Sequence, residues 1–557
     1  MGRGPRLIGS GMVPKKSKER KERSEVHRRK VAPAAPVWWQ PLLVVLLGTM
    51  VYGASLRNGF TNWDDQEYIT DNRDLSEATL HKHFVEKPEV MGNYHPVTML
   101  SLAWSHGLAK DPETGQLDPS VFHRTDLLLH MLCALLVYVF ITGLVSNSWA
   151  GLFTALLFVA HPMHVESVAW ASARKDLLYT FFLLCALVCY LRYVRSSRAW
   201  WLAGTLLLFA LSLLSKAMAV SLVPLLLLID WYHGRKWNVR ALLEKVPFIA
   251  LALYAGLNAV QVQHDFGSIQ DSDAFPFWQR AFFACYGLTF YIVKFIWPSG
   301  LSAFHGYPAP GEPLAWYIWI APVLVAVICV LVWRSRHRRE VVFGAGFFLF
   351  TVVHVLQLLA VGGAMVAERY TYSPYVGLAL VLTTLVMDFA ISRKLALWAP
   401  VAMLSIFVLT LAGVARERSL VWKDGLTLWA DAFAKDGSSP RILSNYGVAL
   451  NMAKRYPEAL AMLDHALQRK TDYAEAFYNR GLAKYYLGRH KDAIDDYTHA
   501  IELSPALAVA WHNRAGTYFT MGRPDLALPD ALKARELGYA VDPKFIQVLE
   551  QQMAARP

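Results

Sequence analysis

This sequence of 557 residues is poor in the features that mark soluble enzymes. Only 18% of the residues are charged, whereas 55% are apolar and 13% are aromatic, and the mean hydropathy is +0.28. The chain contains no Walker loop, dinucleotide-binding fingerprint, nucleophile elbow or zinc-protease motif. It therefore gives no sign of a P-loop nucleotidase, a dinucleotide-dependent dehydrogenase, an α/β-hydrolase or a zinc protease.

Cysteine is also scarce, and no cleavable signal peptide is recognisable. The five cysteines all lie in apolar segments, where they indicate small core residues and not a disulfide framework: Cys133, Cys185, Cys189, Cys285 and Cys329. No small-residue cleavage site follows the first apolar run, Val37–Leu56. We therefore interpret this run as an uncleaved membrane span.

Positive charge is concentrated at the N-terminus. The formal net charge is +12, and much of it lies within residues 1–30. This stretch lacks apolar periodicity, so residues 1–36 are predicted to form a disordered cytoplasmic tail that orients the first span. The charge does not indicate nucleic-acid binding.

Residues 37–415 are predicted to form a polytopic membrane domain, because long apolar runs recur through them. After the first span, further runs lie at about 125–145, 149–161, 177–194, 200–215, 218–232, 246–262, 281–297, 315–333, 341–361, 371–389 and 395–413. Four basic connections are expected on the cytoplasmic face: Arg195–Arg198, His233–Arg240, Arg334–Arg339 and Arg393–Lys394.

Three apolar runs separate the second and third basic connections. If all three crossed the membrane, these connections would lie on opposite faces. We therefore predict that 281–297 is re-entrant or interfacial, which leaves eleven crossings and places the C-terminus opposite the basic tail.

Beyond Arg416 the composition becomes mixed, and the chain repeats with a period of 34 residues. Small residues keep the same places in three copies, the clearest of which is Ala474–Leu507: Ala459, Ala493 and Ala527; Ala466, Ala500 and Ala534; Gly447, Gly481 and Ala515. This pattern predicts three tetratricopeptide repeats over 440–540. Residues 416–439 are predicted to be a linker helix and 541–557 a C-terminal helix or tail, so the whole fold is expected to be all-α.

The first large loop, 57–122, carries an acidic pair directly after the first span. Asp64 and Asp65 follow Trp63, which is expected at the membrane interface. Adjacent carboxylates suit a general base, or a site that orients a hydroxyl and a cation. A solvated turn rich in Asp and Asn is the alternative.

The predicted topology places polar motifs from several other regions on the same face as this pair. Candidate substrate- or phosphate-binding residues are His95, His161, His164, Glu166, Arg174, Asp176, Lys216, Glu368, Arg369 and Tyr370. Charged groups at such depths are costly unless they pair or face a wet cavity, so their convergence favours a site.

Each motif also has a simpler interpretation. His161, His164 and Glu166 could bind a metal, although their spacing is not a standard one. Arg174 and Asp176 could form an interfacial ion pair, while Lys216 and Arg369 could extend to lipid headgroups. In a membrane enzyme the last two cations would equally suit a lipid-linked phosphate.

The order of these motifs resembles a known family. The motifs are Trp63-Asp64-Asp65, Tyr94-His95-Pro96, the stretch from His161 to Glu166, Arg174-Lys175-Asp176-Leu177, Ser215-Lys216, Glu368-Arg369-Tyr370 and the terminal repeats. This order resembles the transmembrane and tetratricopeptide repeat O-mannosyltransferase-like proteins, particularly bacterial relatives, within the GT-C glycosyltransferase superfamily. The resemblance covers most of residues 37–540.

The resemblance implies sugar transfer from a polyprenyl-phosphate donor on the non-cytoplasmic face, with Asp64 at the catalytic centre and Asp65 beside it. The mechanism that we infer for this transfer is inversion, with Asp64 as the base that takes the proton from the acceptor hydroxyl. It implies a multi-pass protein of the bacterial inner membrane with periplasmic repeats that present a polypeptide acceptor. No nucleotide or redox cofactor is implied, and a divalent cation stays an open alternative. Animal relatives commonly have Lys-Glu in place of Lys216-Ala217 and Arg-Pro in place of His95-Pro96, so mannose is not implied.

Two other functions fit the same sequence. An enzyme of this kind could transfer sugar to a lipid or a surface polysaccharide. A membrane scaffold without enzymatic activity could use the repeats to recruit partners and the polar loops for structure alone.

Overall fold

The computed structural model describes residues 37–76, 81–86, 89–267, 275–308, 311–358 and 362–554. The predicted N-terminal tail, 1–36, and the last three residues of the predicted C-terminal segment lie outside these ranges. Within them the regular secondary structure is helical apart from two short antiparallel sheets, β1 (Glu89–Val90) with β2 (Asn93–Tyr94) and β3 (His305–Gly306) with β4 (Ala364–Val366). The prediction of an all-α fold is confirmed.

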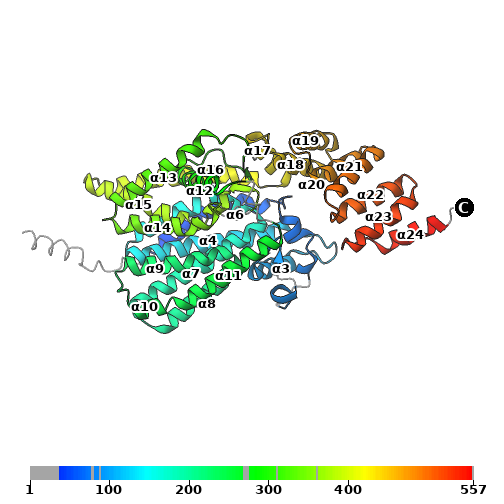
Figure 1. Cartoon of the computed structure of the whole chain (residues 1–557). Coiled ribbons are helices and arrows are strands. Elements are labelled where there is room, and N and C mark those ends of the chain that lie inside the picture. The colour runs from blue at the N-terminus through cyan, green and yellow to red at the C-terminus, as the bar shows by residue number, and fades with distance from the viewer. Residues whose placement is uncertain are drawn as a thin grey trace, which may run out of the picture.

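An apolar helical bundle forms the larger part of the molecule (Figure 1). Its helices are α2 (Trp39–Tyr52), α4 (Pro119–Val145), α5 (Ser148–Ala160), α7 (Arg174–Ser196), α8 (Ala199–Ser215), α9 (Leu222–Tyr232), α11 (Val246–Asp265), α12 (Phe277–Ile296), α13 (Trp316–Arg334), α14 (Arg339–Val352), α15 (Tyr375–Ser392) and α16 (Trp398–Val421). Further helical elements lie in the connections: η1 (Gly53–Arg57), η2 (Gln66–Thr70), η3 (Arg73–Leu75), η4 (Lys82–Glu86), α3 (Pro96–Ala109), η5 (Pro162–His164), α6 (Val165–Ala169), η6 (Ala171–Ala173), η7 (Ala217–Ser221), α10 (Val239–Leu243), η8 (Val353–Val355) and η9 (Glu368–Thr371).

Among the described residues, seven helical stretches are long and apolar enough to cross a membrane, so the protein is a multi-pass membrane protein. They are Trp39–Arg57, Pro119–Val145, Ala171–Ser196, Val239–Asp265, Trp316–Arg334, Tyr375–Ser392 and Trp398–Val421. An eighth candidate is the pair Ser148–Ala160 and Pro162–Ala169, bent by 58°. The bend falls at His161-Pro162, because a proline disfavours helical backbone in the residue before it.

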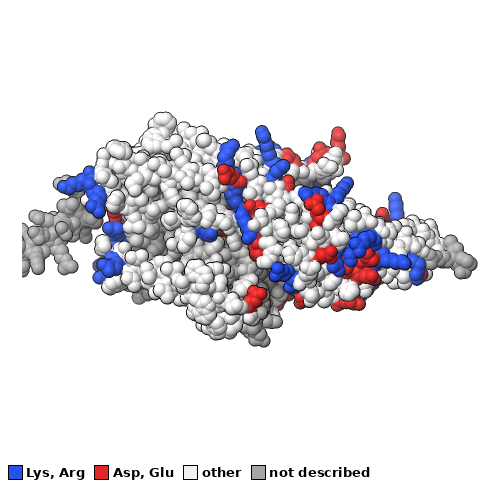
Figure 2. Space-filling model, turned by 90° about the horizontal axis from the view of Figure 1, so that it is seen from above, with Lys and Arg blue, Asp and Glu red and all other residues white. Residues whose placement is uncertain are grey.

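The four predicted basic connections meet at one end of the bundle. Arg339 donates to the carbonyl of Tyr232 (3.2 Å), and Arg338 pairs with Asp388 (3.5 Å). Seen from above, the bundle surface is almost free of charged side chains between this end and the other part of the molecule, where charges of both signs gather (Figure 2). This distribution is the one that a membrane-embedded bundle requires.

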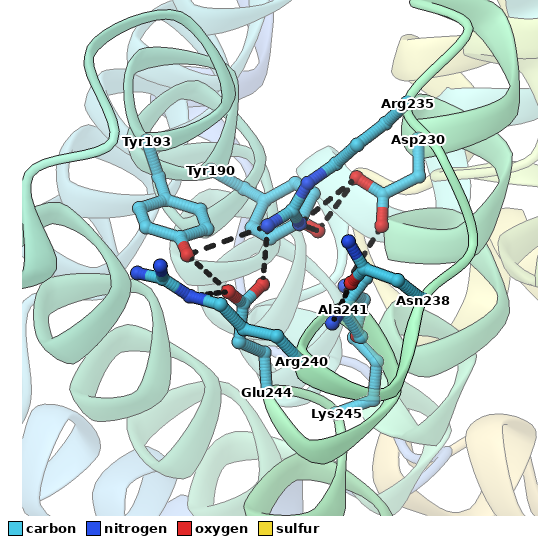
Figure 3. A network of polar contacts seen from close by, with 9 residues as sticks. All are labelled: Tyr190, Tyr193, Asp230, Arg235, Asn238, Arg240, Ala241, Glu244 and Lys245. Atoms are coloured by element: carbon cyan, nitrogen blue, oxygen red, sulfur yellow. Dashed lines mark hydrogen bonds and ion pairs between the residues drawn. The ribbon is translucent and has the colours of Figure 1, made fainter.

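A network of buried charges closes this end between α7, α9, α10 and α11 (Figure 3). Lys245 pairs with Asp230 (2.8 Å), and Arg235 pairs with Glu244 (2.6 Å). Tyr190 donates to Asp230 (2.8 Å), and Tyr193 likewise donates to Glu244 (2.6 Å). Each buried charge thus has an opposite partner, which offsets its desolvation.

The segment predicted to be re-entrant or interfacial is α12. It is one continuous helix, so it is not a re-entrant hairpin. Three helices separate the second and third basic connections, which nevertheless meet at one end. Two of them, α11 and α13, belong to stretches long and apolar enough to cross, whereas α12 does not. An interfacial α12 fits this arrangement, and the count of eleven crossings stays a prediction.

The C-terminal part is a stack of helix pairs that extends from the bundle end opposite the basic connections (Figure 1). Its helices are α17 (Gly425–Lys435), α18 (Pro440–Met452), α19 (Tyr456–Arg469), α20 (Ala474–Tyr486), α21 (His490–Leu503), α22 (Ala508–Thr520), α23 (Pro524–Glu536) and α24 (Pro543–Ala554). The repeating small residues lie where paired helices approach: a Cβ on Gly447 would lie 2.6 Å from Leu463, and one on Gly481 2.8 Å from Tyr497. The predicted tetratricopeptide solenoid is confirmed.

The predicted single linker helix over 416–439 is wrong. Helix α16 continues as far as Val421, and α17 begins separately at Gly425. The break arises because the side chain of Asp424 accepts from the backbone N–H of Thr427 and caps a new helix (2.8 Å).

The first repeat is fastened to the first large loop. The side-chain amide of Asn62 donates to the carbonyl of Asn445 in α18 (3.0 Å), and the ring of Trp63 packs edge-on against Trp429 in α17 (4.9 Å). The guanidinium of Arg441 lies 5.2 Å from the centre of the Trp63 ring. These contacts place the stack and the acidic pair on the same face of the membrane.

Two glycines in the repeats give a matched test of the helix packing. Gly481→Ala places a methyl group against Tyr497, whereas Gly516→Ala meets no atom within 4 Å. We expect the first change to destabilise the stack by about 1–3 kcal/mol and the second to leave it unchanged or stabilise it by up to about 1 kcal/mol. Thermal unfolding of the purified full chain measures both, and equal midpoints for the two variants would contradict the packing.

Candidate functional site

Asp65 is a buried anchor of the first loop. One carboxylate oxygen accepts from the backbone N–H and the hydroxyl of Thr61 (2.8 and 3.0 Å). The other accepts from the backbone N–H and the hydroxyl of Ser172 (3.1 and 2.5 Å). Burial raises the pKa of Asp65, and the four hydrogen bonds oppose that rise. Because both oxygens are occupied, this carboxylate fastens the loop to the start of α7.

Asp64 stands beside this anchor with a different environment. It is half-buried, and no described side chain hydrogen-bonds to its carboxylate or pairs with it. Lys175, in the first turn of α7, lies within electrostatic range of it. The adjacent acidic residues thus differ: Asp65 holds the loop, and Asp64 keeps a carboxylate available for a ligand.

Arg174 belongs to the core. Its Nε donates to Asp126 in α4 (2.6 Å), and both side chains are fully buried. Its other nitrogens donate to the carbonyl of Ser101 (2.9 Å), the hydroxyl of Ser105 (2.7 Å) and the carbonyl of Phe122 (3.1 Å). The predicted alternative, an ion pair between Arg174 and Asp176, is therefore wrong: Arg174 is turned toward α3 and α4 and is already saturated with acceptors.

Asp176 pairs instead with Lys216, at the turn between α8 and η7 (2.6 Å). The carboxylate of Asp176 is fully buried, but the side chain of Lys216 keeps 17% of its surface exposed. The pair therefore holds an ammonium group at the edge of the site and leaves one side of it accessible.

Arg369 is held in a similar way by Glu166. The carboxylate of Glu166 forms an ion pair with the Arg369 guanidinium and accepts from its backbone N–H (2.8 Å). The guanidinium lies over the rings of Trp170 (5.6 Å) and Tyr370 (5.1 Å), and its side chain is 16% exposed. Glu166 and Tyr370 thus position a cation that retains free donors.

Lys175 is a site residue that the sequence reasoning missed. Its ammonium group donates to the hydroxyl of Tyr68 (3.3 Å) and lies 4.4 Å from the centre of that ring. It forms no ion pair within the described residues, although it lies within electrostatic range of Asp64, Asp176 and Arg369. Successive helical residues point about 100° apart, so the triplet that starts at Arg174 sends one cation into the core and the next toward the site.

His95 lies near the same cations. Its ring stacks on Tyr68 (5.5 Å), and it is within electrostatic range of Lys175 and Lys216. Burial lowers the pKa of His95 well below its usual range, and both lysines act in the same direction. His95 is therefore a neutral imidazole at neutral pH and adds no charge to the site.

His161 and His164 are packing residues at the break after α5. A ring nitrogen of His161 lies 3.1 Å from the carbonyl of Phe295, and one of His164 lies 2.8 Å from the carbonyl of Phe158. Both rings also pack against Tyr375. In the part of the chain that the structure describes, no group of three His, Cys, Asp or Glu side chains could hold a metal ion.

Glu368 lies one residue before Arg369 but faces the opposite way, toward the stack. It is fully buried and pairs with Arg418 at the end of α16 (3.5 Å), which in turn pairs with Asp431 in α17 (2.5 Å). Burial raises the pKa of Glu368 to about 7. This chain of charges links the site to the first helix of the C-terminal part.

The structure therefore brings a subset of the predicted residues together with Lys175, which was not predicted. Asp64, Lys175, Lys216, Arg369 and Tyr370 lie at one part-exposed place, where Asp176 and Glu166 hold two of the cations. Asp65, Arg174, His161, His164 and Glu368 instead hold the surrounding segments. The available carboxylate of Asp64 can take up a proton, and the three cations beside it can bind an anionic group such as a phosphate.

Comparisons with known proteins find similar proteins that match parts of the chain. The tetratricopeptide repeat model matches residues 474–507. Protein O-mannosyl-transferase TMTC4 of Homo sapiens is 29% identical over 240 residues, which are 38% of this chain and 32% of that protein. TMTC2 of Mus musculus is 26% identical over 36% of this chain and 25% of its own length, and Tmtc2 of Drosophila melanogaster is 31% identical over 37% and 23%.

The predicted resemblance to O-mannosyltransferase-like proteins of this type is confirmed, although the matched part spans about a third or less of each of these relatives. Among solved structures, a crystal structure of MamA is 20% identical over 28% of this chain and 85% of that one, with a TM-score of 0.19. YrrB is 16% identical over 38% of this chain and 91% of its own, with a TM-score of 0.22.

Proposed function

We propose that this protein is a membrane glycosyltransferase that moves a sugar from a polyprenyl-phosphate donor to a hydroxyl of a polypeptide, with inversion at the anomeric carbon. The reaction takes place on the non-cytoplasmic face of a bacterial inner membrane, and the repeats lie in the periplasm. The observation that carries the proposal is the cluster of Asp64 with Lys175, Lys216 and Arg369 beside the bundle helices. The similarity to O-mannosyl-transferases supports it.

In this mechanism Asp64 is the general base. Its carboxylate takes the proton from a serine or threonine hydroxyl of the acceptor as the oxygen attacks the anomeric carbon of the sugar. The bond between that carbon and the phosphate oxygen breaks, and the electron pair leaves with the phosphate. Asp65 is a positioning residue, since its four hydrogen bonds fix the backbone on which Asp64 is carried.

The cations bind the phosphate and stabilise the charge that develops on it. The phosphodiester of the donor carries one negative charge, and the leaving lipid phosphate gains another. Lys175 is available for this charge because it forms no ion pair with any residue that the structure describes, and Arg369 and Lys216 each expose part of their side chain. Preorganised donors of this kind lower the barrier without the cost of reorientation during the reaction.

We propose that the reaction needs no nucleotide, redox cofactor or resident metal. The lipid phosphate itself is the activated leaving group, and three cations of the chain face it. Transfer should therefore persist when divalent cations are chelated with EDTA.

A polypeptide acceptor is favoured over a lipid or polysaccharide by the position of the stack. Its first repeat is fastened to the loop that carries Asp64, through Asn445 and Arg441. Tetratricopeptide stacks are surfaces for other polypeptides, and this one starts next to the proposed base.

The two acidic residues give the first test of the chemistry. Asp64→Asn keeps the shape but has no useful basicity, so the transfer rate should fall by roughly 10²–10⁴. Asp65→Asn should chiefly lower the thermal stability, by about 1–3 kcal/mol, because an amide NH₂ cannot accept from Thr61 or Ser172. The measurements are sugar transfer from a polyprenyl-phosphate donor to a Ser/Thr peptide, and thermal unfolding. Normal turnover of Asp64→Asn at a normal protein level would remove the base and favour a scaffold.

Lys175 gives a separate test of the phosphate site. Lys175→Ala should lower kcat/KM for the lipid-linked donor by about 10- to 100-fold, whereas Lys175→Arg should retain part of the activity because it keeps the charge. Lys236→Ala, which removes an exposed lysine at the opposite end of the bundle, is the control and should behave as wild type. If Lys175→Ala also behaves as wild type, the phosphate is bound elsewhere.

A further inference from the structure

A polar cleft lies between the first large loop and the far end of the repeat stack. Its volume is about 490 Å³, which is within the range of small-ligand sites. Thr70, Asp71 and Asn72 line it from the loop, Lys110 lines it from the end of α3, and Tyr539 and Ala540 line it from the stack. The stack therefore faces the first loop at both of its ends.

The loop wall of the cleft is a direct continuation of the proposed catalytic segment. The short helix η2 begins immediately after Asp65 and ends at Thr70, where the cleft begins. Asp64 lies two residues before η2, and η2 is a π-helix, which rises less per residue than an α-helix. The α-helical rise of about 1.5 Å per residue therefore sets an upper bound of about 9 Å on the separation of Asp64 and Thr70 along the helix axis. The backbone N–H of Tyr68 donates to the carbonyl of Asp64 (3.0 Å), so the base and the cleft lie close to the two ends of one short helical stretch.

The wall from the stack is also fixed. The ring of Tyr539 stacks on His512 in α22, with 4.5 Å between the ring centres. The backbone N–H of Tyr539 donates to the carbonyl of Ala534 (2.9 Å), and Asp542 caps the helix that follows. Ala540 projects no large side chain and is exposed. The opening is therefore set by the fold of the third repeat.

The chemistry of the lining selects a class of ligand. Hydroxyl, carboxylate, amide and ammonium groups line the cleft, and among its lining residues Leu117 is the one large aliphatic side chain. Such a lining is unsuited to a lipid chain. An extended polypeptide carries a donor and an acceptor on nearly every residue and can satisfy these groups. The cleft is lined by one carboxylate, that of Asp71, and one ammonium group, that of Lys110, so neither sign of charge dominates in it.

We propose that this cleft is an acceptor subsite, which binds an extended stretch of polypeptide next to the serine or threonine that receives the sugar. The proposal rests on the proposed function and assigns the place where its acceptor is held. An extended chain advances about 3.3 Å per residue, so at most about three residues separate the modified hydroxyl at Asp64 from the cleft. An acceptor needs these residues, the modified residue and the residues in the cleft, so one of about three residues in all cannot occupy both sites.

The test places a bulky side chain in the cleft by a substitution in the wall that the stack forms. Ala540→Trp places an indole in the opening, and Ala506→Trp, at another exposed alanine in a turn of the same stack, is the matched control. The probe is a fluorescent, unstructured Ser/Thr peptide of about twelve residues, and a version of about three residues cannot span both sites. Anisotropy measures binding to the full chain in nanodiscs without donor, and a second assay measures transfer from the same polyprenyl-phosphate-linked sugar donor that tests the proposed function.

We expect Ala540→Trp to weaken binding of the long peptide, and to raise its KM in transfer, by about tenfold or more, with kcat and the activity toward the short peptide unchanged. Ala506→Trp should match wild type in every assay. Unchanged binding and KM for Ala540→Trp, or an equal loss for Ala506→Trp, would overturn the cleft assignment and leave the proposed function standing. Binding at the cleft without any transfer by the wild type would instead contradict the proposed function.

Discussion

The ion pair between Asp126 and Arg174 lies where no water reaches, and the geometry of the site depends on it. A buried guanidinium is tolerated only when nearly all of its donors are satisfied, and here α3 and α4 supply the acceptors. This requirement fixes the rotation of the first turn of α7. With Arg174 turned into the core, Lys175 faces the loop and Asp176 faces Lys216. Removal of either partner would leave an uncompensated buried charge. It would also free the side chains of Arg174, Lys175 and Asp176 from their orientations.

Asp65 completes this arrangement from the other side. Its hydrogen bonds to Ser172 join the first loop to the segment that Arg174 holds. The same loop is joined to the stack through Asn62 and Trp63. The bundle, the loop and the repeats thus meet within a few residues of Asp64. A reaction that joins a membrane-bound donor to a polypeptide needs its base at such a junction, because the two substrates approach from different phases.

The sequence predicted what depends on periodicity and composition, namely the bundle and the repeats. Small residues such as Gly481 recur at the repeat period because they are packed against the next helix, so the pattern carries the fold. The different roles of adjacent charged residues could not be predicted from the sequence. Asp64 and Asp65 are identical in the sequence, and only the positions of Thr61 and Ser172 decide which one is occupied. Likewise, the partners of Arg174 come from 48 and more residues away.

The configuration of the sugar linkage tests the central claim most directly. A single base at Asp64, with the phosphate held by cations opposite, requires one displacement at the anomeric carbon. Purified protein supplied with a donor of known configuration and a Ser/Thr peptide should therefore form a linkage of the opposite configuration, read by NMR of the glycopeptide. A retained configuration would require a covalent intermediate on the chain. That result would contradict the assignment of Asp64 as a general base.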